Sequence, residues 1–369
     1  MADVTFFDVP TAASLKKHRI VSKYFGGWAN IVLPNARVRE GRIMYVDLFS
    51  GPGQYRDGTP SIPLLIMQYA IDTPRFHDTL QMIFNDENPE LIAKLQAYVA
   101  QFPGIERLKY KPIFRNRTIG PDIIPRIKRI DVPTLFFADP WGYEGVSTKL
   151  IEASLTHWGS DFLFFFNYNR INMHLGSDVM NAPINEFFTA ERAEHLRKTI
   201  SSLRPVQREA AILSAMRDAV KSIGAQVGLF TYRSATGTRP THHLMCVSKH
   251  RQGMALFKEI SAKESTRFDD SVPSLDHNPA TNPGQGSLFS PMFELEAELV
   301  SAFAGKKDLT AEQIYHEHHI GKPYILKNYR QALLHLEETG AIAVDPPRAA
   351  RRHPDALPST ARITFPSVG

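Results

Sequence analysis

The chain of 369 residues contains one cysteine, Cys246, and no long apolar run. A single cysteine excludes an internal disulfide and a cysteine-based zinc site, and it is typical of a reducing cytosol. No segment reaches the roughly 18 apolar residues that a membrane-spanning helix requires. The N-terminal segment lacks the charged start and apolar core of a signal peptide. We therefore expect a cytoplasmic protein that does not associate with membranes.

Several motifs of common enzyme classes are also absent. The sequence has neither the GxxxxGKS/T loop that cradles phosphates nor the GxGxxG spacing of dinucleotide-binding folds. The nucleophile elbow GxSxG and the zinc-binding HExxH are missing as well. The stretch HEHH at residues 316–319 is near an expected helix end, and we expect no metal site there. These absences argue against P-loop, dinucleotide-binding, α/β-hydrolase and zinc-protease activities.

The composition is that of a packed protein with a mild excess of positive charge. Hydrophobic residues make up 43% of the chain and charged residues 22%, which favours a folded protein over a disordered one. The formal net charge is +5 and the isoelectric point is about 9.1. This charge is compatible with a polyanionic partner. The length predicts two domains, or three.

Apolar segments of strand length alternate with helical segments in the first half of the chain. The expected strands are Ile43–Phe49, Leu80–Phe84, Leu108–Phe114, Thr134–Ala138 and Phe162–Asn167. Because they are apolar throughout, we expect a parallel sheet covered on both faces. Two alternating segments then predict an antiparallel pair, in which His242 and His243 point to opposite faces. This inventory is that of a Rossmann-like class I methyltransferase sheet, mostly parallel with an antiparallel last strand.

The rest of the chain predicts additions to this sheet. We expect a helix at residues 14–33, capped by Ser14 and weakened at its end by two glycines, and extra helices at about 182–223. The α/β domain would then cover residues 1–268. Residues 269–290, rich in Pro, Gly, Asn and Ser, predict a linker. Three helices and a two-stranded wing at 291–369 predict a C-terminal winged-helix domain.

The stretch MYVDLFSGPGQYRDG places Asp47 at the end of the first strand and two glycines in the loop that follows. Ligands of open α/β sheets bind at the carboxyl ends of the strands, where glycine allows close backbone approach. A second acid, Asp86 or Glu87, follows the next strand and is placed to bind ribose hydroxyls. Such a site suits S-adenosylmethionine, which carries an ammonium and a sulfonium but no phosphate. The predicted cofactor-binding residues are Asp47, Phe49, Ser50, Gly51, Pro52, Gly53, Asp86, Glu87 and Asn116. A tight strand-to-helix turn, and a helix cap at residues 86–88, remain the alternatives.

The stretch FFADPWGYEG follows the fourth strand and resembles the D/N-P-P-Y/F/W motif of methyltransferases that act on exocyclic amines. In that motif, a polar side chain and a proline carbonyl accept hydrogen bonds from the target amine, and an aromatic ring stacks on the flipped base. Asp139, Pro140 and Trp141 would take these roles, and Tyr55 would close the pocket. The Trp-Gly pair replaces the usual Pro-aromatic pair, and a simple strand-end turn is the alternative.

Basic residues are concentrated in two regions. Residues 107–129 contain eight lysines and arginines and one acid, Asp122. A recognition helix and a basic wing would give the winged helix further phosphate contacts. The predicted nucleic-acid contacts are Arg115, Arg117, Lys322, Lys327, Arg330, Arg351 and Arg352. Winged helices that bind only protein are the alternative, and the C-terminal domain as a whole is not basic.

Long stretches of the chain resemble the three-Cys-motif partner family, TcmP. The matching segments include KKHRIVSKYFGGWANIVL, YVDLFSGPGQYRDGTPSIPL, FNDENPE, FFADPWGYEGV, FLFFFNYN and HHLMCVSKHRQGMALFKEI, together with the winged helix. The family is regarded as methyltransferase-like and takes its name from a neighbouring protein with three cysteines that resembles radical S-adenosylmethionine enzymes. With one cysteine, this chain would be the partner.

The resemblance and the motifs together predict an S-adenosylmethionine-dependent methyltransferase that modifies nucleic acid, with an exocyclic amine as the candidate acceptor. The alternatives are a non-catalytic binding partner of the three-cysteine protein and a nuclease-like user of nucleotides. No cluster of the PD…(D/E)xK type supports the last of these.

Overall fold

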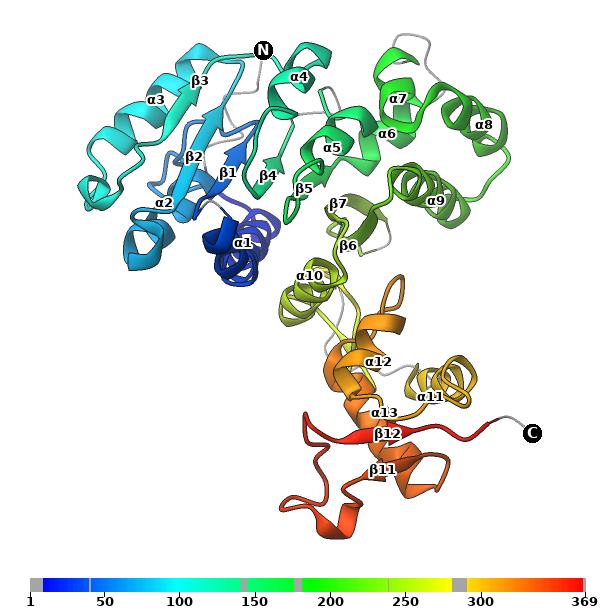
Figure 1. Cartoon of the computed structure of the whole chain (residues 1–369). Coiled ribbons are helices and arrows are strands. Elements are labelled where there is room, and N and C mark those ends of the chain that lie inside the picture. Colours follow the sequence, from blue (N-terminus) through cyan, green and yellow to red (C-terminus); the bar gives the residue numbers. More distant parts are fainter. Residues whose placement is uncertain are drawn as a thin grey trace. The chain divides into compact units, whose positions relative to one another are not determined.

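The computed structural model (Figure 1) describes residues 9–39, 41–140, 145–175, 181–237, 239–280 and 291–367. The chain divides into two compact units, residues 1–257 and 258–369. The division falls within helix α10 (Arg251–Lys263), earlier than the boundary expected from the sequence. In the described ranges, no helix is long and apolar enough to cross a membrane.

The first unit is built on a sheet with the strand order β3-β2-β1-β4-β5-β7-β6. These strands are β1 (Ile43–Asp47), β2 (Leu80–Asn85), β3 (Ile113–Arg115), β4 (Thr134–Ala138), β5 (Asp161–Phe166), β6 (Gln226–Arg233) and β7 (Pro240–Ser248). The first five pair in parallel, whereas β7 runs antiparallel to both β5 and β6. The expected methyltransferase-type sheet is therefore confirmed. The carboxyl ends of β1, β2, β4 and β5 meet at one edge, and the beginning of β7 joins them there.

Helices cover both faces of this sheet (Figure 1). They are α1 (Ala12–Arg39), α2 (Ile62–Asp72), α3 (Pro89–Ala100), α4 (Ile124–Ile127), α5 (Thr148–Ser154), α6 (Tyr168–His174), α7 (Asn181–Phe188), α8 (Ala190–Ile200) and α9 (Pro205–Ser222). One face forms a continuous apolar core with α4, α5, α7, α8 and α9. On the other face, Phe25 of α1 packs edge-on against Tyr45 of β1 and Tyr69 of α2.

One stripe of α1 is anchored to the sheet through polar side-chain ends. Lys17, Tyr24 and Trp28 lie seven and four residues apart, which places them on one helical face. Lys17 forms an ion pair with Asp139. The Tyr24 hydroxyl donates to Asp161 Oδ2 at 2.7 Å, and Trp28 Nε1 donates to the Gly159 carbonyl at 2.8 Å. The Lys17 pair holds the start of α1 at the carboxyl edge of the sheet, and the other two contacts hold its middle at the amino end of β5, which begins at Asp161.

Two glycines that were expected to weaken the end of α1 instead lie inside it. A Cβ on Gly26 would lie 2.6 Å from the Tyr69 hydroxyl oxygen, and one on Gly27 would lie 2.6 Å from Leu256 Cδ1. Neighbouring side chains therefore occupy the space that larger residues would need. The helix continues to Arg39, beyond the expected end.

The segment between β5 and β6 also differs from expectation. Residues 168–174 form α6 directly after β5, ahead of the extra helices expected at about 182–223. The first of the extra helices expected at about 182–223 is divided into α7 and α8 at Thr189, whose φ of 75° is positive and interrupts the helix. The third strand begins later and is shorter than expected.

The second unit contains the expected three helices and wing. They are α11 (Pro291–Ala302), α12 (Ala311–His318), α13 (Leu326–Glu338) and the antiparallel pair β11 (Ala343–Asp345) and β12 (Arg362–Thr364). Thr310 caps α12, since its Oγ1 accepts a hydrogen bond from the Gln313 N–H. Part of the expected linker is ordered as the short strands β8 (Phe268–Asp269), β9 (Val272–Pro273) and β10 (Asp276–His277). Residues 281–290 lie outside the described residues.

Candidate active site

The loop between β1 and α2 is shaped by two glycines at the carboxyl edge of the sheet. Gly51 (φ 62°) and Gly53 (φ 84°) adopt left-handed conformations, which glycine accepts without strain. A Cβ on Gly53 would also lie only 2.5 Å from Leu95 Cδ1. The Ser50 N–H donates to the Asn85 carbonyl at 2.8 Å, which ties the loop to the end of β2.

Asp47 ends β1 and is only 1% exposed. Its Oδ1 accepts a hydrogen bond from the Phe49 N–H at 3.1 Å, and its Oδ2 accepts one from the Tyr45 hydroxyl at 3.3 Å. Burial raises the pKa of Asp47 to about 8, and the negative charges of Asp139 and Asp86 add to the rise. A cationic group placed beside this carboxyl would favour its charged form.

Asp86 follows β2 and contacts the same glycine loop. Its Oδ2 accepts from the Gly51 N–H at 2.8 Å and its Oδ1 accepts from the Asn88 N–H at 2.9 Å. Burial raises the pKa of Asp86. Glu87 is exposed, and Asn88 rather than Asp86 caps α3. The structure thus brings Asp47 and Asp86 to one loop, as the sequence predicted.

Asn116, predicted to meet an adenine ring, holds the backbone after β2 in this structure. Its Nδ2 donates to the carbonyls of Asp86 and Glu87 at 2.9 and 2.8 Å. Both donor hydrogens of the amide are therefore used locally. The residue positions the acidic loop, and only its side-chain carbonyl is left to face a ligand.

Two buried polar atoms beside the loop have no hydrogen-bond partner in the described part of the chain. They are Ser50 Oγ and Asn85 Oδ1. Unpartnered buried polar atoms are uncommon in native proteins, and each calls for an explanation. Together with the two buried acids, these atoms fit a ligand that carries hydroxyl groups and a positive charge.

A second group of side chains lies on the α1 face of the sheet, from β4 to β7. Asp139 directly follows β4, and its ion-pair partner Lys17 is buried. Lys17 Nζ lies 4.4 Å from the centroid of the Phe165 ring. The His242 ring stacks on the same Phe165 ring, with a centroid distance of 4.7 Å and an angle of 12°. The ion pair, the phenyl ring and the imidazole therefore form one connected cluster.

Both histidines near this ion pair are neutral at physiological pH. Burial lowers the pKa of His242 to about 4, and the charge of Lys17 contributes. The pKa of His18 is also lowered to about 4, first by burial and then by Lys17. His18 Nε2 lies 3.4 Å from the Tyr55 hydroxyl oxygen, and burial raises the pKa of Tyr55 to about 12. The two neutral imidazoles and the neutral phenol of Tyr55 thus lie near the ion pair between Lys17 and Asp139.

Sequence reasoning identified Asp139, Pro140 and Tyr55 but missed Lys17, His18 and His242 as members of this cluster. The signal for Lys17 was its position on the apolar stripe of α1, where a buried charge requires a partner. His242 and His243 do face opposite sides of the sheet, since His243 contacts Thr231 and Tyr168 instead. Trp141, predicted to stack on the acceptor, lies outside the described residues.

All the basic side chains at residues 107–129 of the first unit are exposed. The eight basic residues are Arg107, Lys109, Lys111, Arg115, Arg117, Arg126, Lys128 and Arg129. Arg115 ends β3 at the sheet edge, and Arg117 follows just after Asn116. Arg115 and Arg117 therefore lie beside the acidic loop, the loop that carries Asp86 after β2.

The winged-helix basic residues are mostly paired with acids. Lys322 Nζ lies 2.5 Å from Glu298 Oε1, and Arg330 forms an ion pair with Glu312. The prediction for Arg351 requires correction. Its side chain is 1% exposed, with Nη2 2.6 Å from Glu337 Oε1 and Nε donating to the Pro346 carbonyl. A guanidinium enclosed in this way stabilises the fold and cannot reach a phosphate. Of the predicted contacts in this unit, Lys327 and Arg352 are exposed.

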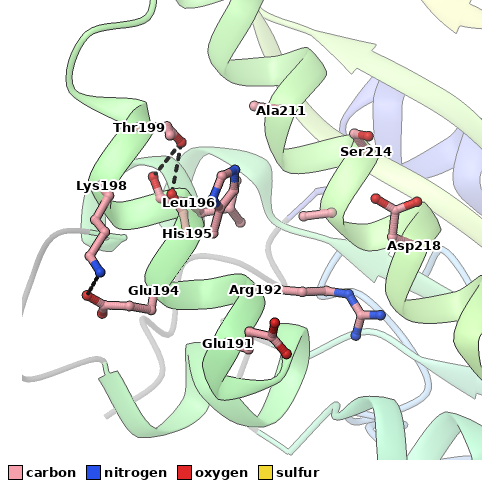
Figure 2. Close-up of a pocket in the computed structure, with 11 residues that line it drawn as sticks. Glu191, Arg192, Glu194, His195, Leu196, Lys198, Thr199, Ala211, Ser214 and Asp218 are labelled. Carbon is pink, nitrogen blue, oxygen red and sulfur yellow. Dashed lines mark hydrogen bonds and ion pairs between the residues drawn. The ribbon is translucent and has the colours of Figure 1, made fainter.

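A separate cavity of about 700 Å³ lies between α8 and α9 (Figure 2). Its charged lining residues are Glu191, Arg192, Glu194, Lys198 and Asp218. Lys198 pairs with Glu194 at 3.3 Å. These helices cover a face of the sheet and do not belong to its carboxyl edge. With acids and bases in similar number, the cavity shows no preference for a ligand of either charge.

Comparisons with known proteins agree with the two-part architecture. A family model described as a GMT-like wHTH domain matches residues 276–349, so the expectation of a winged helix is confirmed. No curated protein matches the sequence.

Solved structures similar to this chain include three methyltransferases. The DszA carbon methyltransferase has a TM-score of 0.40 and 13% identity, over 65% of this chain and 56% of its own length. The plantazolicin methyltransferase BamL, in complex with SAH, has a TM-score of 0.33 and 8% identity, over 63% of this chain and 84% of its own length. Magnesium protoporphyrin IX methyltransferase from Synechocystis PCC 6803, with bound SAM, has a TM-score of 0.28 and 11% identity, over 65% of this chain and 86% of its own length. These TM-scores are too low to support a conclusion about fold or function. The fold is defined by the order and direction of the strands.

Proposed function

We propose that the chain is an S-adenosylmethionine-dependent methyltransferase. The observation that carries the proposal is the convergence of Asp47 and Asp86 on one glycine loop at the carboxyl ends of β1 and β2. In open α/β sheets this edge is where ligands bind. The alternative of a structural turn alone does not account for two buried acids with raised pKa values beside unpartnered polar atoms.

The residues of this edge have distinct tasks in the proposal. The cofactor would supply the methyl group on a sulfonium. Asp86 would accept hydrogen bonds from the ribose hydroxyls of the cofactor, and the carboxylate of Asp47 would attract its positively charged groups. Gly51 and Gly53 allow close approach of the backbone. Asn116 keeps the loop that carries Asp86 in place. Because methyl transfer is an in-line displacement, alignment of the two reactants supplies much of the rate.

We propose nucleic acid as the acceptor, bound by the exposed basic residues at 107–129. These side chains begin beside the acidic loop and can neutralise backbone phosphates. The Asp139-Pro140 sequence suggests an exocyclic amine as the methylated group, whereas the ion pair between Asp139 and Lys17 weighs against it.

The role of Asp139 can be tested separately from cofactor binding. Asp139→Asn keeps a hydrogen-bond acceptor for Lys17 but removes the charge. We expect labelled-methyl transfer to fall by about 100-fold or more, as in other sites that lose a preorganised charge. Affinity for S-adenosylhomocysteine should change less than about threefold. Loss of cofactor affinity in this variant would place Asp139 in the cofactor site instead.

The second candidate is a non-catalytic partner protein, as the resemblance to the TcmP family suggests. The observation in its favour concerns Asp139, at the carboxyl end of β4, which we call the acceptor corner. The carboxylate of Asp139 is already paired with Lys17. Tight binding of S-adenosylhomocysteine without transfer to DNA, RNA or protein would favour this candidate over the enzyme.

A further inference from the structure

The charge next to the acceptor corner distinguishes between two kinds of methyl acceptor. An amine nucleophile is neutral and becomes positively charged as it attacks the methyl group. A hydroxyl oxygen attacks while it loses its proton, so negative charge develops on it. The ammonium of Lys17 lies at this corner and is held there by Asp139. Although the pair carries no net charge, the lysine ammonium is a hydrogen-bond donor only, so it can stabilise a developing oxyanion but offers no acceptor to the N–H groups of an attacking amine.

The same cluster contains a group that can take the proton. His242 stacks on the phenyl ring that also contacts Lys17, on the face of the sheet that carries Asp47 and Asp139. The charges that act on this imidazole come from Lys17, Asp139 and Arg170. It is half-buried, whereas His18 is buried against Tyr55. A partly open, neutral imidazole can accept a proton, and the nearby ammonium lowers its basicity.

We propose that the acceptor is a ribose hydroxyl of RNA, with Lys17 stabilising the oxygen and His242 accepting its proton. This inference rests on the proposed function, since among nucleic acids RNA carries a hydroxyl on each internal sugar. In the step, the O–H bond breaks and its proton passes to His242. The oxygen forms the O–CH3 bond while the bond from sulfur to methyl breaks. The sulfonium leaves as the neutral thioether S-adenosylhomocysteine.

The test uses the full chain, labelled S-adenosylmethionine and RNA and DNA oligonucleotides of matched sequence, with total protein as a third substrate. Products are digested to nucleosides and the methylated atom is identified by mass spectrometry. We expect ribose O-methylation of RNA and none of DNA. Methyl groups on base nitrogens would overturn this inference but leave the proposed function standing. Methylation of protein alone would overturn this inference and the nucleic-acid acceptor, and would leave only the methyltransferase activity. Absence of transfer to all three would contradict both.

Two pairs of variants test the residues. Lys17→Met should reduce transfer by about 100-fold or more, and Lys23→Met, an exposed change on the same helix, should have no effect. His242→Ala should reduce transfer by about 100-fold, and added imidazole should restore part of it. His195→Ala is the control, since His195 is exposed on α8.

Affinity for S-adenosylhomocysteine and the melting temperature are measured for every variant. His242→Ala that folds and binds normally but is not rescued by imidazole would remove the base from the mechanism. Full transfer by either variant would contradict its assigned role.

Discussion

The carboxyl edge of the sheet and the winged helix contain the same types of ionisable residue but place them in different environments. At the sheet edge, Asp47 and Asp86 are buried beside a glycine loop, and their pKa values are raised. In the winged helix, Glu298, Glu312 and Glu337 each lie against a lysine or arginine. Carboxyls buried without such a partner cost stability, and such costs are concentrated at functional sites. We therefore infer that the acids of the sheet edge bind a ligand, whereas most of the acids of the winged helix stabilise its fold.

The largest effect that tests this contrast is expected at Asp47. We predict that Asp47→Asn lowers the affinity for S-adenosylhomocysteine by about 100-fold, because the buried charge that faces the ligand is lost. The same change should stabilise the protein by about 1–3 kcal/mol at pH 8. The raised pKa means that the folded protein loses stability as pH rises from 3.8 towards 8, where the buried carboxyl ionises.

Unfolding measured from pH 5 to pH 8 should therefore show a steeper decline with pH in the wild type than in the Asn variant. If Asp47→Asn destabilised the protein and retained its affinity for the ligand, Asp47 would be a structural residue and the contrast would fail.

The next effect concerns the fold of the winged helix. Arg351→Ala leaves Glu337 without its buried partner, and we expect a loss of about 3 kcal/mol of stability in the second unit. Arg352→Ala, at an exposed neighbouring position, should change stability by less than about 0.5 kcal/mol. Hydrogen exchange of α13 and the wing in the full chain measures both. Equal exchange in the two variants would show that the Arg351 pair does not stabilise the domain.

The smallest effect compares the two basic regions as nucleic-acid contacts. Arg115→Glu combined with Arg117→Glu should weaken RNA binding by about tenfold or more at low salt. The slope of log affinity against log salt concentration should become shallower by the equivalent of about two phosphate contacts. Lys322→Ala combined with Arg330→Ala should change affinity less than about threefold, because both side chains are paired. Fluorescence anisotropy across a salt series distinguishes the regions. The reverse order would identify the winged helix as the main RNA contact.

Local sequence pattern was enough to predict the sheet and the acidic loop. The apolar strands and the acid that ends each of two neighbouring strands are encoded over a few residues, and parallel pairing brings those ends together. The cap of α12 at Thr310 is local in the same way, because Thr310 and Gln313 are three residues apart. These features depend on residues close in sequence.

The parts that could not be predicted depend on contacts between distant segments. The pair of Lys17 with Asp139 joins residues 122 positions apart, and no local spacing reveals it. Gly26 resembled a helix end, but its role is set by Tyr69 in another helix. Arg351 resembled a surface charge because its acid lies in α13 rather than in the wing.

The central claim is that the glycine loop, together with Asp47 and Asp86, binds an adenosyl group. Calorimetric titration of the full chain with S-adenosylhomocysteine tests it most directly. We predict one site with a dissociation constant of about 100 μM or tighter, which corresponds to roughly −5.5 kcal/mol or more of binding free energy. Absence of binding at millimolar ligand, with the protein folded, would contradict the account.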